Sequence, residues 1–205
     1  MMKSIWKIWF RARCSAAALI EDRSGVVAIE FAMIVPIMLV LFFGTLELSS
    51  GVAVDRKVSL IARTISDLTS QNKAVITSQV AGFFNASGAI MTPYSGTPTN
   101  AVVTELFVDP STLKARVQWS QAYQGGVARA IGSTVAIPTA LAIGGTYLIY
   151  GEVNYLYTPT IGYVMSKAGV TLSDVSYTRP RQSLCVFYNP SNPASLPPDT
   201  SCPTS

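Results

Sequence analysis

An uncharged apolar run near the N-terminus constrains this chain more than any other feature. The fifteen residues from Phe31 to Thr45 carry no charge, and the wider stretch from Val26 to Leu46 is 21 residues long. As an α-helix such a stretch extends about 30 Å, which is the thickness of the hydrocarbon core of a bilayer. Apart from a threonine near its end, only Glu30 and Pro36 interrupt it. We therefore expect a transmembrane helix over residues 26–46 rather than a buried core helix.

The residues that precede this run are basic. Residues 1–25 carry a net charge of +3, from five basic and two acidic side chains: Lys3, Lys7, Arg11, Arg13 and Arg23 against Glu21 and Asp22. The positive-inside rule places such a leader in the cytoplasm and the bulk of the chain outside. A cleaved secretory signal fits poorly, because its apolar region is shorter and ends at a small-residue cleavage site that is missing here.

The composition argues against a nucleic-acid-binding protein and against most enzymes. The 180 residues after the leader carry ten basic and nine acidic side chains, a net charge of only +1. Histidine, the commonest general base and zinc ligand, is absent from the whole chain. No Gly-x-Ser-x-Gly motif is present, and Ser166 beside Lys167 is too common a pair to identify a nucleophile. We expect no catalytic, cofactor or metal site, with an anchored periplasmic enzyme as a weaker alternative.

Two of the three cysteines lie near the C-terminus, beyond the expected membrane span. Cys14 belongs to the leader, whereas Cys185 and Cys202 lie on the side predicted to be outside. In an oxidising compartment such a pair favours a disulfide, worth about 3 kcal/mol on the chain-entropy model. Two free thiols are the alternative.

The acidic residue at the start of the apolar run needs an explanation. An ionised carboxylate in a membrane helix costs about 2.5 to 3.5 kcal/mol on insertion scales. Around it the chain reads RSGVVAIEF, with Gly25, four residues, Glu30 and then Phe31. This arrangement resembles the processing motif of type IV prepilins, and more closely that of the Flp and Tad branch. The resemblance implies that a membrane-embedded prepilin peptidase cuts between Gly25 and Val26 on the cytoplasmic face.

The same resemblance gives Glu30 a role in assembly. Cleavage after Gly25 would create an α-amino group on Val26, and packing of subunits would bury that cation. A buried unpaired ion is strongly disfavoured, whereas a paired one is tolerated. Glu30 would then neutralise the amino group of a neighbouring subunit, and its place in the first turn would suit the helix macrodipole. The alternative is a carboxylate that merely extends to the cytoplasmic interface.

The span and its flanks are similar to the N-terminal signature of TadE-like pseudopilins. Six positions carry that similarity: Glu30, Phe31, Ala32, Pro36, Gly44 and Glu47. The resemblance implies a minor pilin or pseudopilin needed for assembly of a Tad pilus and for adherence. The implied partners are a prepilin peptidase, the major pilin and sister pseudopilins, the inner-membrane assembly platform and membrane lipid.

Other readings stay open at this point. TadF-like subunits share the signature. A TadG-like metal site would need Asp-x-Ser-x-Ser, which Asp109 and Ser111 begin but Leu113 does not complete. A type II secretion pseudopilin is a further possibility. A chain that keeps its leader would instead be a membrane-anchored periplasmic binding module.

Periodicity predicts an α+β fold, in which the long N-terminal helix continues into a small extracytoplasmic domain with an antiparallel sheet. Residues 47–72 have an apolar stripe at helical spacing, comprising Val54, Val58, Ile61, Ala62, Ile65 and Leu68. Residues 73–205 form the expected periplasmic domain, and a second helix is predicted over residues 72–84, ending near Asn85 and Gly88.

Alternating and β-branched residues predict the strands. Val102–Val108 and Leu113–Tyr123 should form a hairpin about the turn sequence DPST. In its second strand the residues Leu113, Ala115, Val117 and Trp119 should share one face, with Lys114, Arg116, Gln118 and Ser120 on the other. Residues 125–145 should form a connection with a short helix. Further strands are expected over residues 146–159 and 170–188, before a proline-rich tail.

Overall fold

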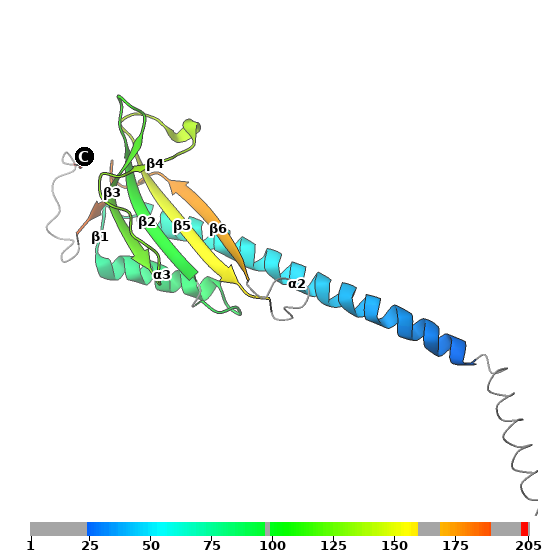
Figure 1. The fold of residues 1–205 in the computed structure, drawn as a ribbon. Helices are drawn as coiled ribbons and strands as arrows, with labels where there is room; N and C mark the ends of the chain where they lie inside the picture. Colours follow the sequence, from blue (N-terminus) through cyan, green and yellow to red (C-terminus); the bar gives the residue numbers. More distant parts are fainter. Residues whose placement is uncertain (1–23, 97–98, 160–168, 190–201, 205) are drawn as a thin grey trace, which may run out of the picture. The chain divides into compact units, whose positions relative to one another are not determined.

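The computed structural model describes residues 24–96, 99–159, 169–189 and 202–204. The chain divides into two compact units, Met1–Glu47 and Leu48–Ser205. Helix α2 (Ser24–Ser70) supplies all the described residues of the first unit and enters the second (Figure 1). The predicted helical span therefore does continue beyond the apolar run without a break in the helix.

The first part of α2 has the properties of a membrane span. Within the described residues it is the one helix long and apolar enough to cross a membrane, and none of its most apolar window is buried. Pro36 lies inside the helix, where it removes one backbone hydrogen bond. In lipid, neighbouring helices can satisfy the carbonyl that such a proline frees.

The second part of α2 belongs to the core of the second unit, Leu48–Ser205, which we call the outer unit after its predicted position outside the membrane. Five residues of the predicted stripe are fully buried: Val54, Val58, Ile61, Ala62 and Ile65. Leu68 is half-buried. The predicted amphipathic helix is confirmed, because the stripe packs in the same cluster as Val80 and Phe84 of helix α3 (Thr77–Ile90).

Helix α3 begins and ends later than its periodicity predicted. Residues Ala74–Val75 form the short strand β1 instead of a first helical turn. The side-chain oxygen of Gln79 accepts the N–H of Ile76 at 3.1 Å, which caps the helix at its actual start.

The outer unit contains a five-stranded antiparallel sheet of strand order β4-β3-β2-β5-β6 (Figure 1). Its strands are β2 (Thr99–Val108), β3 (Ala115–Tyr123), β4 (Thr134–Val135), β5 (Tyr147–Tyr157) and β6 (Val170–Thr178). A short 3-10 helix η1 (Thr139–Leu141) follows β4. Strand β7 (Phe187–Tyr188) pairs in parallel with β1. The predicted α+β class with an antiparallel sheet is confirmed.

The two faces of this sheet are covered by different elements. On one face, Val103, Ile149 and Val153 join the cluster that contains the α2 stripe and α3. On the other face, Leu106, Val117 and Leu148 pack under the connection that carries β4 and η1, through residues such as Val135, Ile137 and Leu141. The predicted connection therefore forms a cover for the second face.

A glycine allows α2 to lie close against β5. A Cβ at Gly151 would be 2.7 Å from the carbonyl oxygen of Ala62, closer than real Cβ contacts occur. Glycine is thus required here because the helix backbone approaches the strand. This contact fixes where α2 crosses the sheet.

The predicted face assignment of β3 is wrong at its centre. Glu105 is opposite Trp119 and Leu106 is opposite Val117, so Gln118 is an extra residue in a β-bulge. Val117 and Trp119 consequently belong to clusters on opposite faces, and Gln118 and Ser120 are buried rather than exposed.

Two strand boundaries also differ from the prediction. Leu113 has a φ of +56° and belongs to the hairpin turn, so β3 starts at Ala115. The strand expected over residues 170–188 is divided into β6 and β7. Pro180 lies between them, and proline cannot donate to a strand ladder.

Candidate processing and assembly site

The predicted cleavage site lies in the first turn of α2. The helix begins at Ser24, so the bond between Gly25 and Val26 follows directly. The N–H groups of a first helical turn have no partner within the helix, so fewer backbone hydrogen bonds hold this turn than hold the interior of the helix. The side chain of Val26 is 52% exposed. The leader residues 1–23, including Cys14, lie outside the described residues.

Gly25 is not required by the fold of the helix. A Cβ placed on Gly25 would meet no heavy atom within 4 Å. Because no neighbouring atom in the described chain requires a glycine at this position, its presence is consistent with recognition by another molecule. A substitution by alanine here therefore tests recognition without disturbing packing.

Glu30 is exposed in the second turn of α2, which begins at Ser24. The predicted first-turn position of Glu30 refers to a helix that begins at Val26 after cleavage, and it stays a prediction. The uncleaved helix starts two residues before Val26, which moves Glu30 away from the helix terminus. Residues four apart share one face of a helix, so Glu30 lies on the same face as Val26. An amino group formed at Val26 and the carboxylate of Glu30 would therefore be on one face of the mature helix.

Large apolar side chains are exposed along the helix that carries Glu30. Phe31 is 68% exposed, Met33 is 69% exposed and Leu41 is 63% exposed. Soluble proteins rarely leave so much contiguous apolar surface in water. This surface suits contact with lipid or with the helices of other subunits.

Cys185 and Cys202 are joined by a disulfide, with their Cα atoms 6.0 Å apart. Cys185 is fully buried and packs with Phe107 and Tyr147 at one end of the sheet. The hydroxyl of Tyr147 donates to the carbonyl of Pro203 at 2.8 Å. These contacts hold the last described residues of the chain against the sheet.

A buried glutamate on β2 holds the segment next to this disulfide. The carboxylate of Glu105 is fully buried, and its Oε1 accepts the N–H of Val186 at 2.5 Å. The indole N–H of Trp119 donates to the carbonyl of the same residue at 2.7 Å. Both backbone groups of Val186 are therefore satisfied by side chains of the sheet. We call Glu105 and Trp119 the Val186 clamp.

Burial raises the pKa of Glu105 to about 8, although hydrogen bonds from Val186 and Trp119 oppose this shift. Its Oε2 has no hydrogen-bond partner among the described residues. Sequence reasoning missed this residue. The sequence could have predicted its burial, because alternate residues of a strand share one face and Glu105 lies between the apolar residues Val103 and Phe107, which are both buried.

Asp109 has a structural explanation in the hairpin turn. Its Oδ1 accepts hydrogen bonds from the backbone and side chain of Ser111, at 2.8 and 2.5 Å. Its other oxygen lies 3.2 Å from the guanidinium of Arg116. These bonds lower its pKa to about 2, the side-chain bond with Ser111 contributing most. The described residues contain no cluster of possible metal ligands.

The comparisons with known proteins agree with the resemblance over the N-terminal part of the chain. Residues 25–65 match the family model described as TadE-like protein. The match begins at Gly25 and includes Glu30, the rest of the span and most of the α2 stripe. No curated protein and no solved structure matches the chain. The TadE-like resemblance is thus confirmed for about a fifth of the sequence.

Proposed function

We propose that this chain, whose residues 25–65 match the TadE-like family, is a minor pilin or pseudopilin that assists assembly of a tight-adherence pilus. The observation that carries the proposal is the position of Gly25, Val26 and Glu30 at the start of an exposed apolar helix. In an isolated membrane anchor, a carboxylate within that helix is only a cost. In an assembly subunit it neutralises a charge created by processing.

The proposed sequence of events starts at the cytoplasmic surface. A prepilin peptidase hydrolyses the bond after Gly25 and leaves the mature chain with an ammonium group on Val26. When subunits associate through their apolar helices, Glu30 of one subunit accepts hydrogen bonds from the amino group of an adjacent one. Charge-assisted hydrogen bonds of this kind are about twice as strong as neutral ones.

The proposed orientation places the leader in the cytoplasm and the outer unit in the periplasm of a bacterial inner membrane. The basic leader supports this orientation through the positive-inside rule. The Cys185–Cys202 disulfide supports it too, because disulfides persist in oxidising compartments.

The proposed partners follow from this placement. The apolar surface of α2 would contact lipid, the major pilin and sister pseudopilins. The leader and the start of α2 would meet the prepilin peptidase and the inner-membrane assembly platform. We propose an assembly role without catalysis for the outer unit, in which Asp109, Glu152 and Asp67 lie in ion pairs and Glu105 lies in the Val186 clamp.

Deletion and complementation test this function. We expect a host strain that lacks this chain to lose most of its sheared pilus filaments and its surface attachment, because a priming or connecting subunit would be missing. Restoring the wild-type chain should restore both. The measurement is the amount of major pilin in the sheared fraction, compared with the amount in whole cells. Normal filaments and normal attachment in the deletion strain would contradict the assembly role and would favour the alternative, a membrane-anchored binding module.

A further inference from the structure

We infer that a groove between α2 and β6 binds an extended acidic segment of a partner protein, which adds as a strand to the edge of β6. The inference concerns the outer unit alone. It goes beyond the proposed function, because it requires neither cleavage after Gly25 nor the carboxylate of Glu30.

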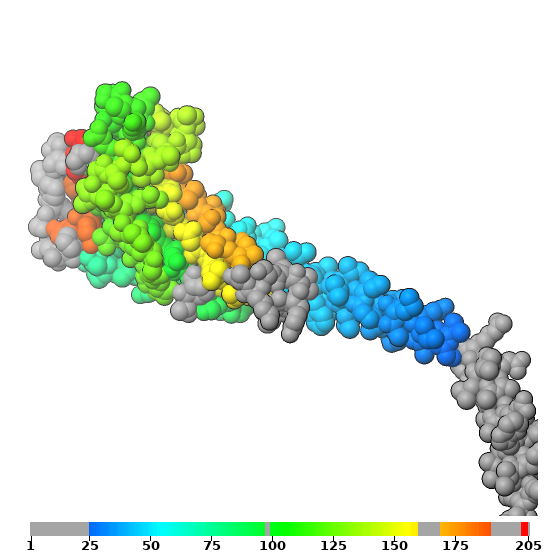
Figure 2. Space-filling view, viewed as in Figure 1, coloured from blue at the N-terminus to red at the C-terminus, as the bar shows by residue number. Residues whose placement is uncertain are grey.

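Strand β6 is an edge strand among the described residues. It pairs with β5 along its whole length, Val170–Thr178, and with no other described strand. Figure 2 shows β6 in orange at the surface, between β5 in yellow and α2 in cyan. An edge of this kind presents backbone N–H and C=O groups to an added strand. A nine-residue strand is long enough to align a short peptide.

Beside this edge lies a groove of about 360 Å³. Residues of α2, including Arg63 and Asp67, form one wall. Ser176, Thr178 and Arg181, from β6 and the chain just after it, form the other wall. The groove therefore follows the same strand that offers a backbone edge.

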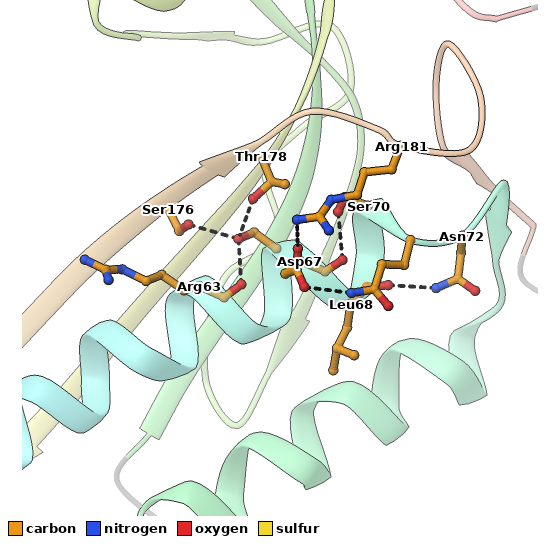
Figure 3. A network of polar contacts seen from close by, with 10 residues as sticks. Arg63, Asp67, Leu68, Ser70, Asn72, Ser176, Thr178 and Arg181 are labelled. Carbon is orange, nitrogen blue, oxygen red and sulfur yellow. Dashed lines mark hydrogen bonds and ion pairs between the residues drawn. The ribbon is translucent and has the colours of Figure 1, made fainter.

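Hydroxyl groups hold the two walls together. The hydroxyl of Ser66 on α2 lies 3.0 Å from that of Ser176 and 3.1 Å from that of Thr178 (Figure 3). Arg181 is held on the other side of this network, because its backbone N–H donates to the carbonyl of Ser70 at 2.9 Å. Hydrogen bonds between α2 and the segment 176–181 therefore fix the shape of the groove.

The charge in the groove is unbalanced. Asp67 forms an ion pair with Arg181, so its carboxylate is already used. Arg63 is exposed, and its side chain forms no ion pair with a described residue. In Figure 3 the side chain of Arg63 extends away from Asp67, whereas that of Arg181 reaches toward it. Arg63 is therefore available for a carboxylate brought by another molecule, which it can bind through two parallel hydrogen bonds.

These features favour an acidic partner over a second copy of this chain. A second copy joined through β6 would bring its own Arg63 to the same seam. Its Asp67 would already be paired with its own Arg181. Such pairing brings the second copy's Asp174, an acid on β6 that forms no ion pair with a described residue, together with the second copy's Arg63, so the seam gains no net negative charge. An extended segment that carries aspartate or glutamate and no basic residue supplies that negative charge.

The test uses the full chain in neutral detergent micelles and fluorescent nonapeptides. The acidic probe alternates threonine and valine and carries two glutamates, and the basic probe has lysine at the same positions. We expect fluorescence anisotropy to show that the acidic probe binds about tenfold more tightly than the basic one. The change Arg63→Glu should reverse this preference. The matched control Arg56→Glu, an exposed arginine seven residues earlier on α2, should change either affinity less than about twofold.

Four results would overturn the inference. The first is equal binding of the two probes, and the second is an equal effect of Arg63→Glu and Arg56→Glu, which would indicate general electrostatics. The third is unchanged binding of an acidic probe that is N-methylated at every residue, because such a peptide has no N–H group left to donate to a strand edge. Concentration-dependent self-association that excludes the acidic probe would identify a second copy as the occupant and would also overturn it.

Discussion

Replacement of Glu30 by alanine is expected to abolish filament assembly while leaving the outer unit folded. Without the carboxylate, packing of the mature helices would bury the amino group of Val26 without a partner. Removal of one member of a buried ion pair costs about 3 to 5 kcal/mol, which weakens association by roughly 150-fold to 5,000-fold. Glu30→Gln should fail nearly as completely, because an amide cannot neutralise the cation. Glu30→Asp keeps the charge and should retain partial assembly.

The measurement is the quantity of sheared filament in strains that produce each variant at equal levels. Asp55→Ala is the matched control, because Asp55 is an exposed acid on the same helix but beyond the span. We expect this control to assemble normally. Each variant must still be processed to Val26, so that a loss of filaments reports assembly rather than cleavage. Normal piliation by Glu30→Ala would contradict the charge-pairing role.

Replacement of Glu105 by alanine is expected to destabilise the outer unit more than any other change of a single acidic residue there. The change leaves the N–H of Val186 buried without its acceptor and opens a cavity beside Trp119. Large-to-alanine changes in a core cost about 2 to 5 kcal/mol, and an unsatisfied buried donor costs about 1 to 3 kcal/mol. A combined loss of about 4 kcal/mol is expected.

Chemical unfolding of the detergent-solubilised chain, followed through tryptophan fluorescence, measures this loss. Trp119 stacks on Tyr188 with ring centroids 5.5 Å apart. The other two tryptophans, Trp6 and Trp9, belong to the leader, so the change in signal when the outer unit unfolds reports the Val186 clamp.

Glu152→Ala is the control. Glu152 lies on the same sheet and pairs with Arg129 at 2.7 Å in a partly exposed site, where such a pair is worth about 1 kcal/mol or less. Equal losses for the two variants would exclude the special role of Glu105.

The stability of the outer unit should also fall as the pH rises from about 5 to 8. The pKa of Glu105 is raised from 4.5 to about 8 by folding. Between these values the folded state binds a proton that the unfolded state has released, so the contribution is complete below 4.5 and is lost as the pH rises through 8. The expected slope is about 1.4 kcal/mol per pH unit. Asp109 titrates near 2 and does not interfere.

Glu105→Gln should remove most of this pH dependence, because the amide does not titrate. The measurement is the free energy of unfolding of the wild type and the variant at pH 5, 6, 7 and 8. A slope that persists unchanged in the variant would assign the pH dependence to other groups.

The parts of the fold that sequence reasoning predicted depend on local periodicity. The α2 stripe repeats every three or four residues and is buried as predicted, from Val54 to Ile65. The hairpin of β2 and β3 follows from two apolar runs about a turn sequence. At the candidate site, the positions of Gly25 and Glu30 on one apolar helix were also predictable, because motif and helix occupy the same short stretch.

The parts that sequence reasoning missed depend on contacts between distant residues. The bulge at Gln118 is set by pairing with β2, and no local pattern marks it. The Val186 clamp joins residues 81 and 67 positions apart. The groove beside β6 depends on the meeting of Arg63 with a strand more than a hundred residues later. The start of α2 at Ser24 was missed because the expected helix was defined by the apolar run alone.

The most direct test of the account is the intact mass of the membrane-extracted protein from cells with and without the prepilin peptidase. We predict a chain of 180 residues that begins at Val26 when the peptidase is present, and the full 205-residue chain when it is absent. Gly25→Ala, which adds a methyl group where no atom lies within 4 Å, should also yield the full chain. A protein that retains Met1 in cells with an active peptidase would contradict the account.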